Sequence, residues 1–178
     1  MEFMAQANKK FGVRSLLVQG LTFLSVLTSA FMIWKGLSLF TNSESPVVVV
    51  LSGSMEPAYY RGDILFLHNG YSPIEIGEVV VYKVKEKPIP IVHRVLKVHN
   101  DNTSGKQFLL TKGDNNNEAD DRGIYNPGQK WISRDDIIGR VRGFVPYAGM
   151  GTIWMNDYPQ LKMILLGTLC VLSLFTNE

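Results

Sequence analysis

The feature that most constrains this sequence is an uncharged apolar run close to its N-terminus. No Asp, Glu, Lys or Arg occurs between Leu16 and Trp34. At about 1.5 Å per residue, a helix over this run is about 28 Å long, close to the thickness of the hydrocarbon core of a bilayer. We therefore predict a transmembrane helix over residues 16–36.

Residues on either side of this run predict its orientation. Three basic residues, Lys9, Lys10 and Arg14, precede it. At its far end Trp34 offers an indole ring, which suits the membrane interface. The positive-inside rule places residues 1–15 in the cytosol and the chain after the helix on the other side of the membrane, a type II topology with a single span.

A cleaved signal peptide is the alternative interpretation of the same run. Thr28, Ser29 and Ala30 are small enough to resemble a processing site. The apolar run continues past them through Phe31 to Trp34, and its length exceeds the usual core of a signal peptide. A retained signal anchor is therefore the preferred prediction.

Composition removes several classes of protein. The 178 residues include 18 basic and 16 acidic ones, a formal net charge of +2, and these charges are spread along the chain. Binding to nucleic acid, which needs a concentrated basic surface, is therefore not expected. The single cysteine, Cys170, cannot form an internal disulfide, and it excludes a cysteine-rich metal site.

The sequence after the hydrophilic linker 42–46 predicts a β-rich domain. Short β-branched runs alternate there with Gly, Pro, Asn and Asp. We predict one mainly β domain over residues 37–160, with a long surface loop from Lys112 to Lys130. The expected strands are Val47–Leu51, Ile64–His68, Val79–Val84, Ile91–Val98, Phe108–Thr111 and Ile137–Phe144.

A second apolar segment, Met163–Phe175, lies near the C-terminus. It follows Pro159, a residue suited to the first turn of a helix. A helix of thirteen residues is only about 20 Å long, too short to cross an ordinary bilayer. Over residues 161–178 we predict a short apolar helix, buried or interfacial, and a tail.

Two serines stand where an apolar strand must end. The run Val47-Val-Val-Val-Leu leads directly into Ser52-Gly-Ser54 and then meets Pro57. With a period of two, Val48, Val50, Ser52 and Ser54 lie on one face, so that apolar side chains and hydroxyls address the same groove. Met55 is also expected at this groove. A peptide held along such an edge is bound through its main chain, while shallow pockets select alternate side chains.

A serine nucleophile needs a base, because an unassisted hydroxyl is barely ionised at neutral pH. Of the three histidines, His93 lies inside a strand-like apolar run, whereas His68 and His99 stand near the ends of their predicted strands. His93 is therefore the best candidate for the base.

An orienting carboxylate would come most naturally from the polar loop. This loop offers Asp114, Asp120 and Asp121, and spacing alone does not choose among them. The adjacent Asp120 and Asp121 should point in different directions, so that only one of them reaches the histidine. A solvated acidic loop, with or without a bound cation, is the bland alternative.

Taken together, these blocks resemble the endoplasmic reticulum branch of the signal peptidase I family, the branch formed by the catalytic subunits of signal peptidase complexes. The resemblance extends over nearly the whole chain. The blocks that carry it are Ile33-Trp-Lys-Gly36, Ser43-Glu-Ser-Pro46, Ser52-Gly-Ser-Met-Glu-Pro57, Arg61-Gly-Asp63, Ile89-Pro-Ile-Val-His-Arg94, Lys112-Gly-Asp-Asn-Asn116, Asp120-Asp-Arg-Gly123, Gly143-Phe-Val-Pro146 and Met155-Asn-Asp-Tyr-Pro159.

The resemblance implies roles for individual residues. Ser54 would be the nucleophile, His93 the general base and Asp121 the carboxylate that orients it. The Ser54 N–H and the Ser52 hydroxyl would stabilise the oxyanion, and Asp114 would be a supporting or alternative acid. Bacterial relatives carry a lysine at the position of His93.

The resemblance also implies a serine endopeptidase that removes signal peptides at the luminal face of the endoplasmic reticulum membrane. Its partners would be signal peptides, accessory membrane subunits and the lipid bilayer, and it would need no metal or organic cofactor. The family's β-rich catalytic domain stands behind one N-terminal transmembrane helix, with a short apolar C-terminal helix in a locally thinned membrane.

Two other functions remain open at this point. The β domain could belong to a non-enzymatic subunit that binds nascent chains, or to a different serine hydrolase. The second is disfavoured because the Gly-x-Ser-x-Gly elbow of α/β hydrolases is absent around Ser54. A sequon at Asn102-Thr-Ser104 would be luminal in the predicted topology.

Overall fold

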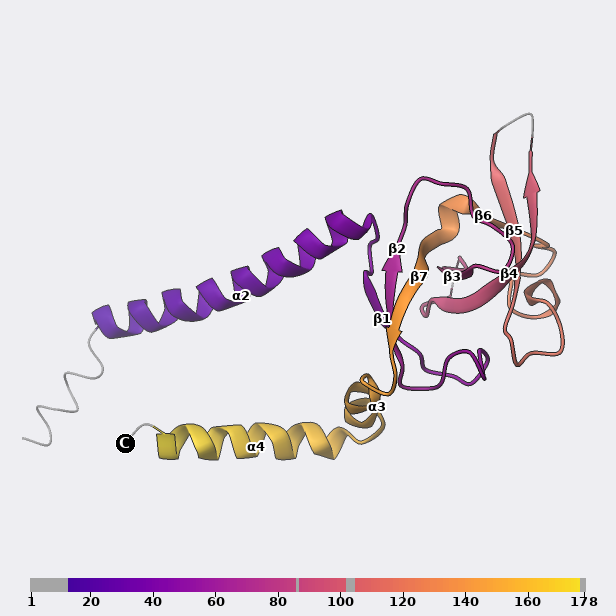
Figure 1. Cartoon of the computed structure of the whole chain (residues 1–178). Helices are drawn as coiled ribbons and strands as arrows, with labels where there is room; N and C mark the ends of the chain where they lie inside the picture. The colour runs from indigo at the N-terminus through magenta and orange to yellow at the C-terminus, as the bar shows by residue number, and fades with distance from the viewer. Residues whose placement is uncertain (1–12, 86, 102–104, 177–178) are drawn as a thin grey trace, which may run out of the picture. The chain divides into compact units, whose positions relative to one another are not determined.

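The structure is a computed structural model that describes residues 13–85, 87–101 and 105–176 (Figure 1). The sequon at residues 102–104 and the basic pair Lys9 and Lys10 lie outside the described residues. The chain divides into two compact units with the boundary between Phe40 and Thr41. One unit holds a long helix, and the other holds the β-sheet and the C-terminal helices.

Helix α2 extends over Val13–Thr41, and its part Leu17–Thr41 is, within the described residues, the one helical segment that is both long and apolar enough to cross a membrane. Its apolar side chains have no protein cover, since Leu17, Phe23 and Ile33 are each more than 60% exposed. Hydroxyls within the helix, such as those of Thr22 and Ser29, donate to carbonyls of the preceding turn at 2.9 and 2.7 Å. The helix thus offers a lipid-compatible surface with its polar groups satisfied internally.

The second unit is built on a seven-stranded antiparallel sheet with the order β1-β2-β7-β3-β4-β5-β6 (Figure 1). The strands are β1 Val47–Val49, β2 Ile64–His68, β3 Val79–Tyr82, β4 Ile91–Asn100, β5 Gln107–Lys112, β6 Ile132–Ser133 and β7 Ile137–Val145. The predicted fold class, a β-rich domain behind one N-terminal apolar helix, is confirmed. The strand nearest the C-terminus, β7, lies between β2 and β3 and joins the two hairpin-like halves of the sheet.

Five of the six predicted strands differ from the observed ones by one or two residues at an end, and several short elements were not predicted. Strand β1 ends at Val49, because the backbone of Val50 bonds instead to the turn before β2, with its N–H on Asp63 O at 2.9 Å. The predicted loop contains a single 3-10 turn, η1, over Asp120–Arg122. Strand β6 was not predicted, because a strand of two residues carries no period to detect.

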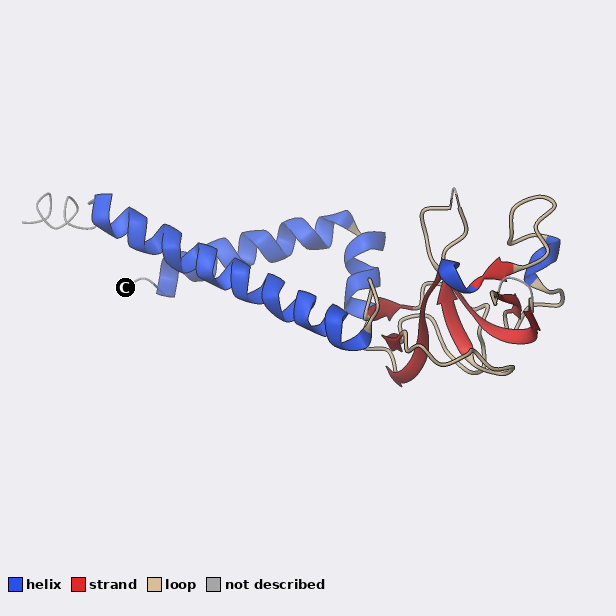
Figure 2. Ribbon diagram, turned by 90° about the horizontal axis from the view of Figure 1, so that it is seen from above, coloured by secondary structure: helices blue, strands red, loops and turns tan. Residues whose placement is uncertain are grey.

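The C-terminal part consists of α3 over Met150–Asp157 and α4 over Pro159–Thr176. Helix α4 begins at the proline that the sequence marked as a helix start, and at about 1.5 Å per residue it is about 27 Å long. Helix α4 is therefore longer at both ends than the predicted segment Met163–Phe175. Figure 2 shows the helical and sheet parts of this unit by colour.

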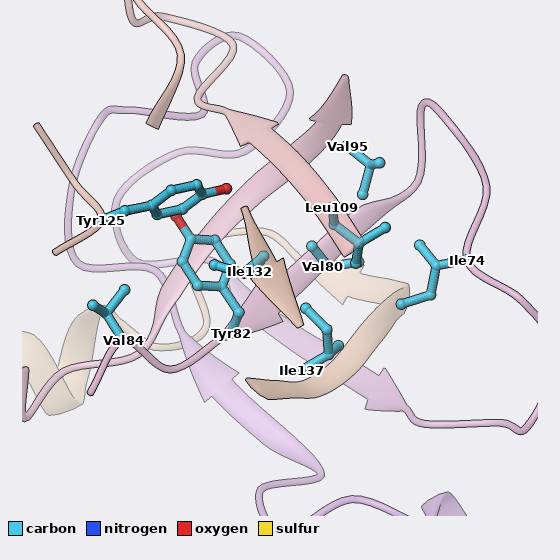
Figure 3. Close-up of a cluster of buried hydrophobic side chains, with 9 residues drawn as sticks. All are labelled: Ile74, Val80, Tyr82, Val84, Val95, Leu109, Tyr125, Ile132 and Ile137. Atoms are coloured by element: carbon cyan, nitrogen blue, oxygen red, sulfur yellow. The ribbon is translucent and has the colours of Figure 1, made fainter. Parts of the chain in front are cut away.

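Two apolar cores lie on the two faces of the sheet. The first contains nine buried side chains, including Tyr82 and Tyr125, whose rings meet edge to face at 5.9 Å (Figure 3). The second is formed by Val50, Leu65, Leu67 and Val81, so that the segment after β1 packs over β2 and β3. This packing brings the segment after the edge strand β1 toward β3, in the middle of the sheet. In the pairing order three strands separate β1 from β4, so strand pairing alone would not bring this segment near β4.

Candidate active site

The turn after β1 presents Ser54 at its surface. The next side chain, Met55, is only 1% exposed and anchors the turn in the protein, while its carbonyl accepts the Tyr59 N–H at 3.0 Å. The Gly53 carbonyl accepts the Glu56 N–H at 3.2 Å. Ser54 therefore stands on a short, internally bonded turn and not on an extended strand.

His93 reaches this serine from β4. It is paired with Val80 of β3 in the register of the sheet and is only 1% exposed. Its Nε2 lies 3.2 Å from the Ser54 Oγ, and its Nδ1 lies 2.6 Å from Asp120 Oδ2. When the Nδ1 proton is donated to the carboxylate, the lone pair of Nε2 faces the serine hydroxyl, the arrangement required of a general base.

The carboxylate at His93 belongs to Asp120, whereas the resemblance had pointed to Asp121. Both residues belong to the 3-10 turn η1, in which neighbouring side chains are about 120° apart, so only one of the two can point inward. Asp120 is 1% exposed and meets the histidine, whereas Asp121 is exposed. One residue of the pair therefore reaches the histidine, and the structure places Asp120 there, not the Asp121 that the resemblance implies.

Two hydroxyls also donate to the same carboxylate oxygen. Tyr82 donates to Asp120 Oδ2 at 2.8 Å and Thr111 donates to it at 2.5 Å. Tyr125 extends the network, with its hydroxyl 2.8 Å from Thr111 Oγ1. Burial, followed by the charge of Asp120, raises the pKa of Tyr82, and burial raises the pKa of Tyr125 to about 12, so both phenols remain neutral donors at working pH.

The other carboxylate oxygen has a different environment. Asp120 Oδ1 is buried and has no hydrogen-bond partner within the described part of the chain. All the donors that fix this side chain therefore converge on one oxygen, and that oxygen also faces the imidazole. The carboxylate is held in a single orientation toward His93.

Asp114 does not take part in this relay. Its carboxylate forms a two-pronged ion pair with Arg94, with Nε on Oδ1 at 2.9 Å and Nη2 on Oδ2 at 2.7 Å. The hydrogen bonds and charge of Asp114 raise the pKa of the Arg94 guanidinium. The pair ties the loop after β5 to β4 directly beside His93, which makes Asp114 a structural neighbour of the site.

The same loop contacts the nucleophile through Gly113. A Cβ built on this glycine would lie 2.6 Å from the Ser54 carbonyl oxygen and 2.8 Å from His93 Nε2. Only a residue without a side chain permits this approach. The next residue but one, Asn115, donates its backbone N–H to the Ser54 carbonyl at 2.9 Å.

Ser52 lies beside Ser54. The two hydroxyl oxygens are 3.3 Å apart. The Ser54 N–H has no bonded acceptor among the residues that the structure describes. An N–H and a hydroxyl are thus both present next to Ser54 Oγ.

A groove of about 830 Å³ leads to Ser54 and His93. The predicted groove residues Val48, Val50 and Met55 all line it. The segment from Lys87 through Val92, which includes the start of β4, lines it as well. This segment was not predicted at the groove, although its Pro88-Ile-Pro90 is a visible turn signal.

The other two histidines are not part of the site. His99 stacks near Trp131 with ring centres 6.0 Å apart, and His68 lies in β2. Three residues at the site were not predicted: Tyr82, Thr111 and Tyr125. Strand register brings them to Asp120, and the register could not be predicted from the sequence.

Sequence comparisons agree with this geometry. A family model described as "Signal peptidase C-terminal short helix" matches residues 152–175. The human signal peptidase complex catalytic subunit SEC11C is 56% identical over 171 residues, which are 96% of this chain and 88% of the relative. A subunit of the same name, SEC11, from Schizophyllum commune is 51% identical over 188 residues, covering 97% of both chains. The Dictyostelium discoideum subunit is 56% identical over 153 residues, 86% of this chain and 84% of the relative.

The fold and the relatives define a membrane-anchored peptidase. The aligned regions are more than 50% identical and cover most of this chain and of each of these two relatives. The chain belongs to the family of signal peptidase complex catalytic subunits.

Proposed function

We propose that this chain is a serine endopeptidase that removes N-terminal signal peptides from secretory and membrane preproteins, using Ser54, His93 and Asp120. The observation that carries the proposal is the continuous contact from Ser54 Oγ through both ring nitrogens of His93 to Asp120 Oδ2, at 3.2 and 2.6 Å. Hydroxyl, imidazole and buried carboxylate in this order form the constellation of nucleophilic serine hydrolysis.

The reaction proceeds in two halves. Ser54 Oγ attacks the scissile carbonyl carbon while His93 Nε2 takes the hydroxyl proton, and Asp120 stabilises the resulting imidazolium. The C–N bond then breaks, His93 gives the proton to the leaving amine, and the signal-peptide side remains as an ester on Ser54. Water, deprotonated by His93, hydrolyses this ester and restores the serine.

The oxyanion of each tetrahedral intermediate needs donors next to the nucleophile. The Ser54 N–H is available, and the Ser52 hydroxyl lies 3.3 Å from Ser54 Oγ. Each such donor contributes about 2.7–4 kcal/mol in acyl-transfer enzymes. We assign both groups to the oxyanion hole.

We propose that the groove selects substrates with small side chains before the cleaved bond. Strand β1 is at the edge of the sheet and pairs with β2 on one side. Every second residue of β1, such as Val49, therefore has its backbone N–H and C=O facing outward. An extended peptide can add to this edge through main-chain hydrogen bonds. Val48, Val50 and Met55 then limit the size of the alternate side chains that enter the groove.

The membrane contributes to specificity in this proposal. Helix α2 anchors the enzyme in the endoplasmic reticulum membrane in type II orientation, and the catalytic domain, predicted over residues 37–160 and beginning after α2 ends at Thr41, lies in the lumen. Signal peptides in the same bilayer are then met at a high effective concentration. Accessory membrane subunits complete the complex, as the names of the relatives indicate for those proteins.

The test is processing of a preprotein by the full chain, purified in detergent from its native membranes with its accompanying subunits. Ser54→Ala and His93→Ala should abolish cleavage without lowering the melting temperature by more than a few degrees. His99→Ala is the matched control, since that ring lies away from the site, and it should retain activity. Cleavage at a near-normal rate by the Ser54 variant contradicts the proposal and favours a non-catalytic role for this turn.

A further inference from the structure

Asn115 holds the backbone on both sides of Ser54. Its N–H donates to the Ser54 carbonyl at 2.9 Å, and its side-chain Nδ2 donates to the Gly53 carbonyl at 3.1 Å. These two carbonyls belong to the two peptide groups that flank Ser54 Cα. One residue of the loop after β5 therefore contacts the turn that carries the nucleophile at two points.

The contact with Gly53 fixes the direction of a different group. The Gly53 carbonyl and the Ser54 N–H belong to the same planar trans peptide unit, in which C=O and N–H point in opposite directions. The Asn115 amide at 3.1 Å and the Glu56 N–H at 3.2 Å both donate to this carbonyl and hold its direction, so that the Ser54 N–H is aimed to the other side. Within the described residues that N–H meets no acceptor, so the fold leaves it available.

We propose that Asn115 is a positioning residue, which orients the Ser54 N–H toward the oxyanion through its amide bond to the Gly53 carbonyl. The inference rests on the proposed function, because it assumes acyl transfer to Ser54. It adds a residue that contacts the backbone of Ser54 and Gly53 but has no hydrogen bond to the Ser54 hydroxyl, to His93 or to Asp120.

The loop that carries Asn115 is itself fixed at several points. Lys112 Nζ donates to the Asn116 carbonyl at 2.6 Å, and Asp114 is held by Arg94 through two hydrogen bonds. The Asn116 N–H donates to the Gly113 carbonyl at 3.0 Å and closes the turn. Asn115 is thus presented to the Ser54 turn from a braced loop, although its side chain is exposed at the site.

The neighbouring residue Asn117 supplies a matched control. It has the same side chain, lies in the same loop, is exposed, and forms no hydrogen bond within the described part of the chain. Asn115→Asp removes the donor and places a negative charge against the Gly53 carbonyl, and Asn117→Asp adds the same charge without touching the turn. A comparison of these two variants separates the lost hydrogen bond from the added charge.

The experiment uses the full chain in its native detergent-solubilised assembly, a signal-sequence peptide substrate and two peptide inhibitors of identical sequence. One inhibitor ends in an aldehyde, whose carbonyl carbon forms a reversible bond to Ser54 Oγ while the hydroxyl proton passes to His93, which creates an oxyanion-like oxygen. The other ends in the corresponding primary alcohol and forms no such bond. We measure kcat, KM, both inhibition constants and the pH dependence of kcat.

For Asn115→Asp we expect kcat to fall about tenfold or more, part of the effect of deleting an oxyanion donor outright. KM and the alcohol inhibition constant should stay within about twofold, the aldehyde should bind more weakly by the same factor as kcat falls, and the pH profile of kcat should keep its shape. Asn115→Gln, which keeps a donor, should recover part of the rate. Asn117→Asp should match the unmodified protein.

Two results would overturn the inference. One is an Asn115→Asp variant that behaves like Asn117→Asp. The other is an equal loss of aldehyde and alcohol binding, which indicates a disordered groove. Failure of the proposed function itself gives a different result, because Ser54→Ala would then still cleave the substrate, whatever happens at Asn115.

Discussion

Replacement of Asp120 by Asn tests which of the two adjacent carboxylates supports His93. In the protein the imidazolium that forms during the reaction faces a carboxylate with an N–O distance of 2.6 Å. With charge centres about 4 Å apart and an effective dielectric constant of about 20, this pair is worth about 4 kcal/mol, or about a thousandfold in rate.

The hydrogen bonds of the site add a second loss. If the Asn amide oxygen takes the place of Oδ2, its NH₂ lies at the Oδ1 position, where the described residues offer no partner. If the amide turns over, its NH₂ donates to His93 Nδ1 and forces the ring proton onto Nε2, which then cannot accept the Ser54 proton. We therefore expect kcat to fall by about 10³–10⁴ for Asp120→Asn.

The assay is single-turnover cleavage of a preprotein by the detergent-solubilised full chain, with melting temperature as the measure of folding. The unpaired amide should lower the free energy of unfolding by about 1–3 kcal/mol, which leaves the variant folded. Asp121→Asn is the control and should keep kcat within about twofold, because that side chain is exposed. A folded Asp120→Asn variant with near-normal kcat, or an inactive Asp121→Asn variant, would refute this assignment.

Two further predictions follow from contacts near the site. Gly113→Ala should lower kcat by about a hundredfold or more, because its Cβ would lie 2.6 Å from the Ser54 carbonyl oxygen, whereas Gly143→Ala, with no atom within 4 Å of a built Cβ, should leave the cleavage rate unchanged. Burial raises the pKa of Tyr125 to about 12 from the ordinary value of 10.0, so the folded state favours the protonated phenol. Its stabilising contribution, about 3 kcal/mol, is complete below pH 10 and is lost as pH rises toward 12. Melting temperatures over this range should fall less steeply for Tyr125→Phe than for the unmodified protein, and identical slopes contradict the argument.

The sequence predicted the elements of this protein that repeat with a regular period. Strand β2 was predicted with its observed bounds, and α2 followed from an uncharged run that only lipid or a large core can accommodate. The local patterns made Ser54 and His93 candidates, a hydroxyl at a forced strand end and a histidine in an apolar strand, but their roles were predicted from the family resemblance of the surrounding blocks.

The carboxylate and its donors depended on information that is not local. The 3-10 turn directs the side chains of Asp120 and Asp121 to different sides. A shift of the turn by one residue along the sequence would change which of the two is buried. Tyr82 and Thr111 converge on Asp120 because β3, β4 and β5 pair in a particular register, which includes a shift between Val95 and Lys97. Neither the phase of a single turn nor a register with a bulge can be read from composition or spacing.

The place of β7 in the sheet has a consequence for the biosynthesis of the enzyme. The serine side of the site belongs to β1 and β2 and the histidine side to β3 and β4. Strand pairing joins the two sides through β7, the last of the seven strands to be synthesised. A nascent chain that ends before residue 137 already contains Ser54, His93 and Asp120, yet it lacks the strand that unites them. Under the proposed function, activity therefore arises only after β7 has been translated, long after the synthesis of α2.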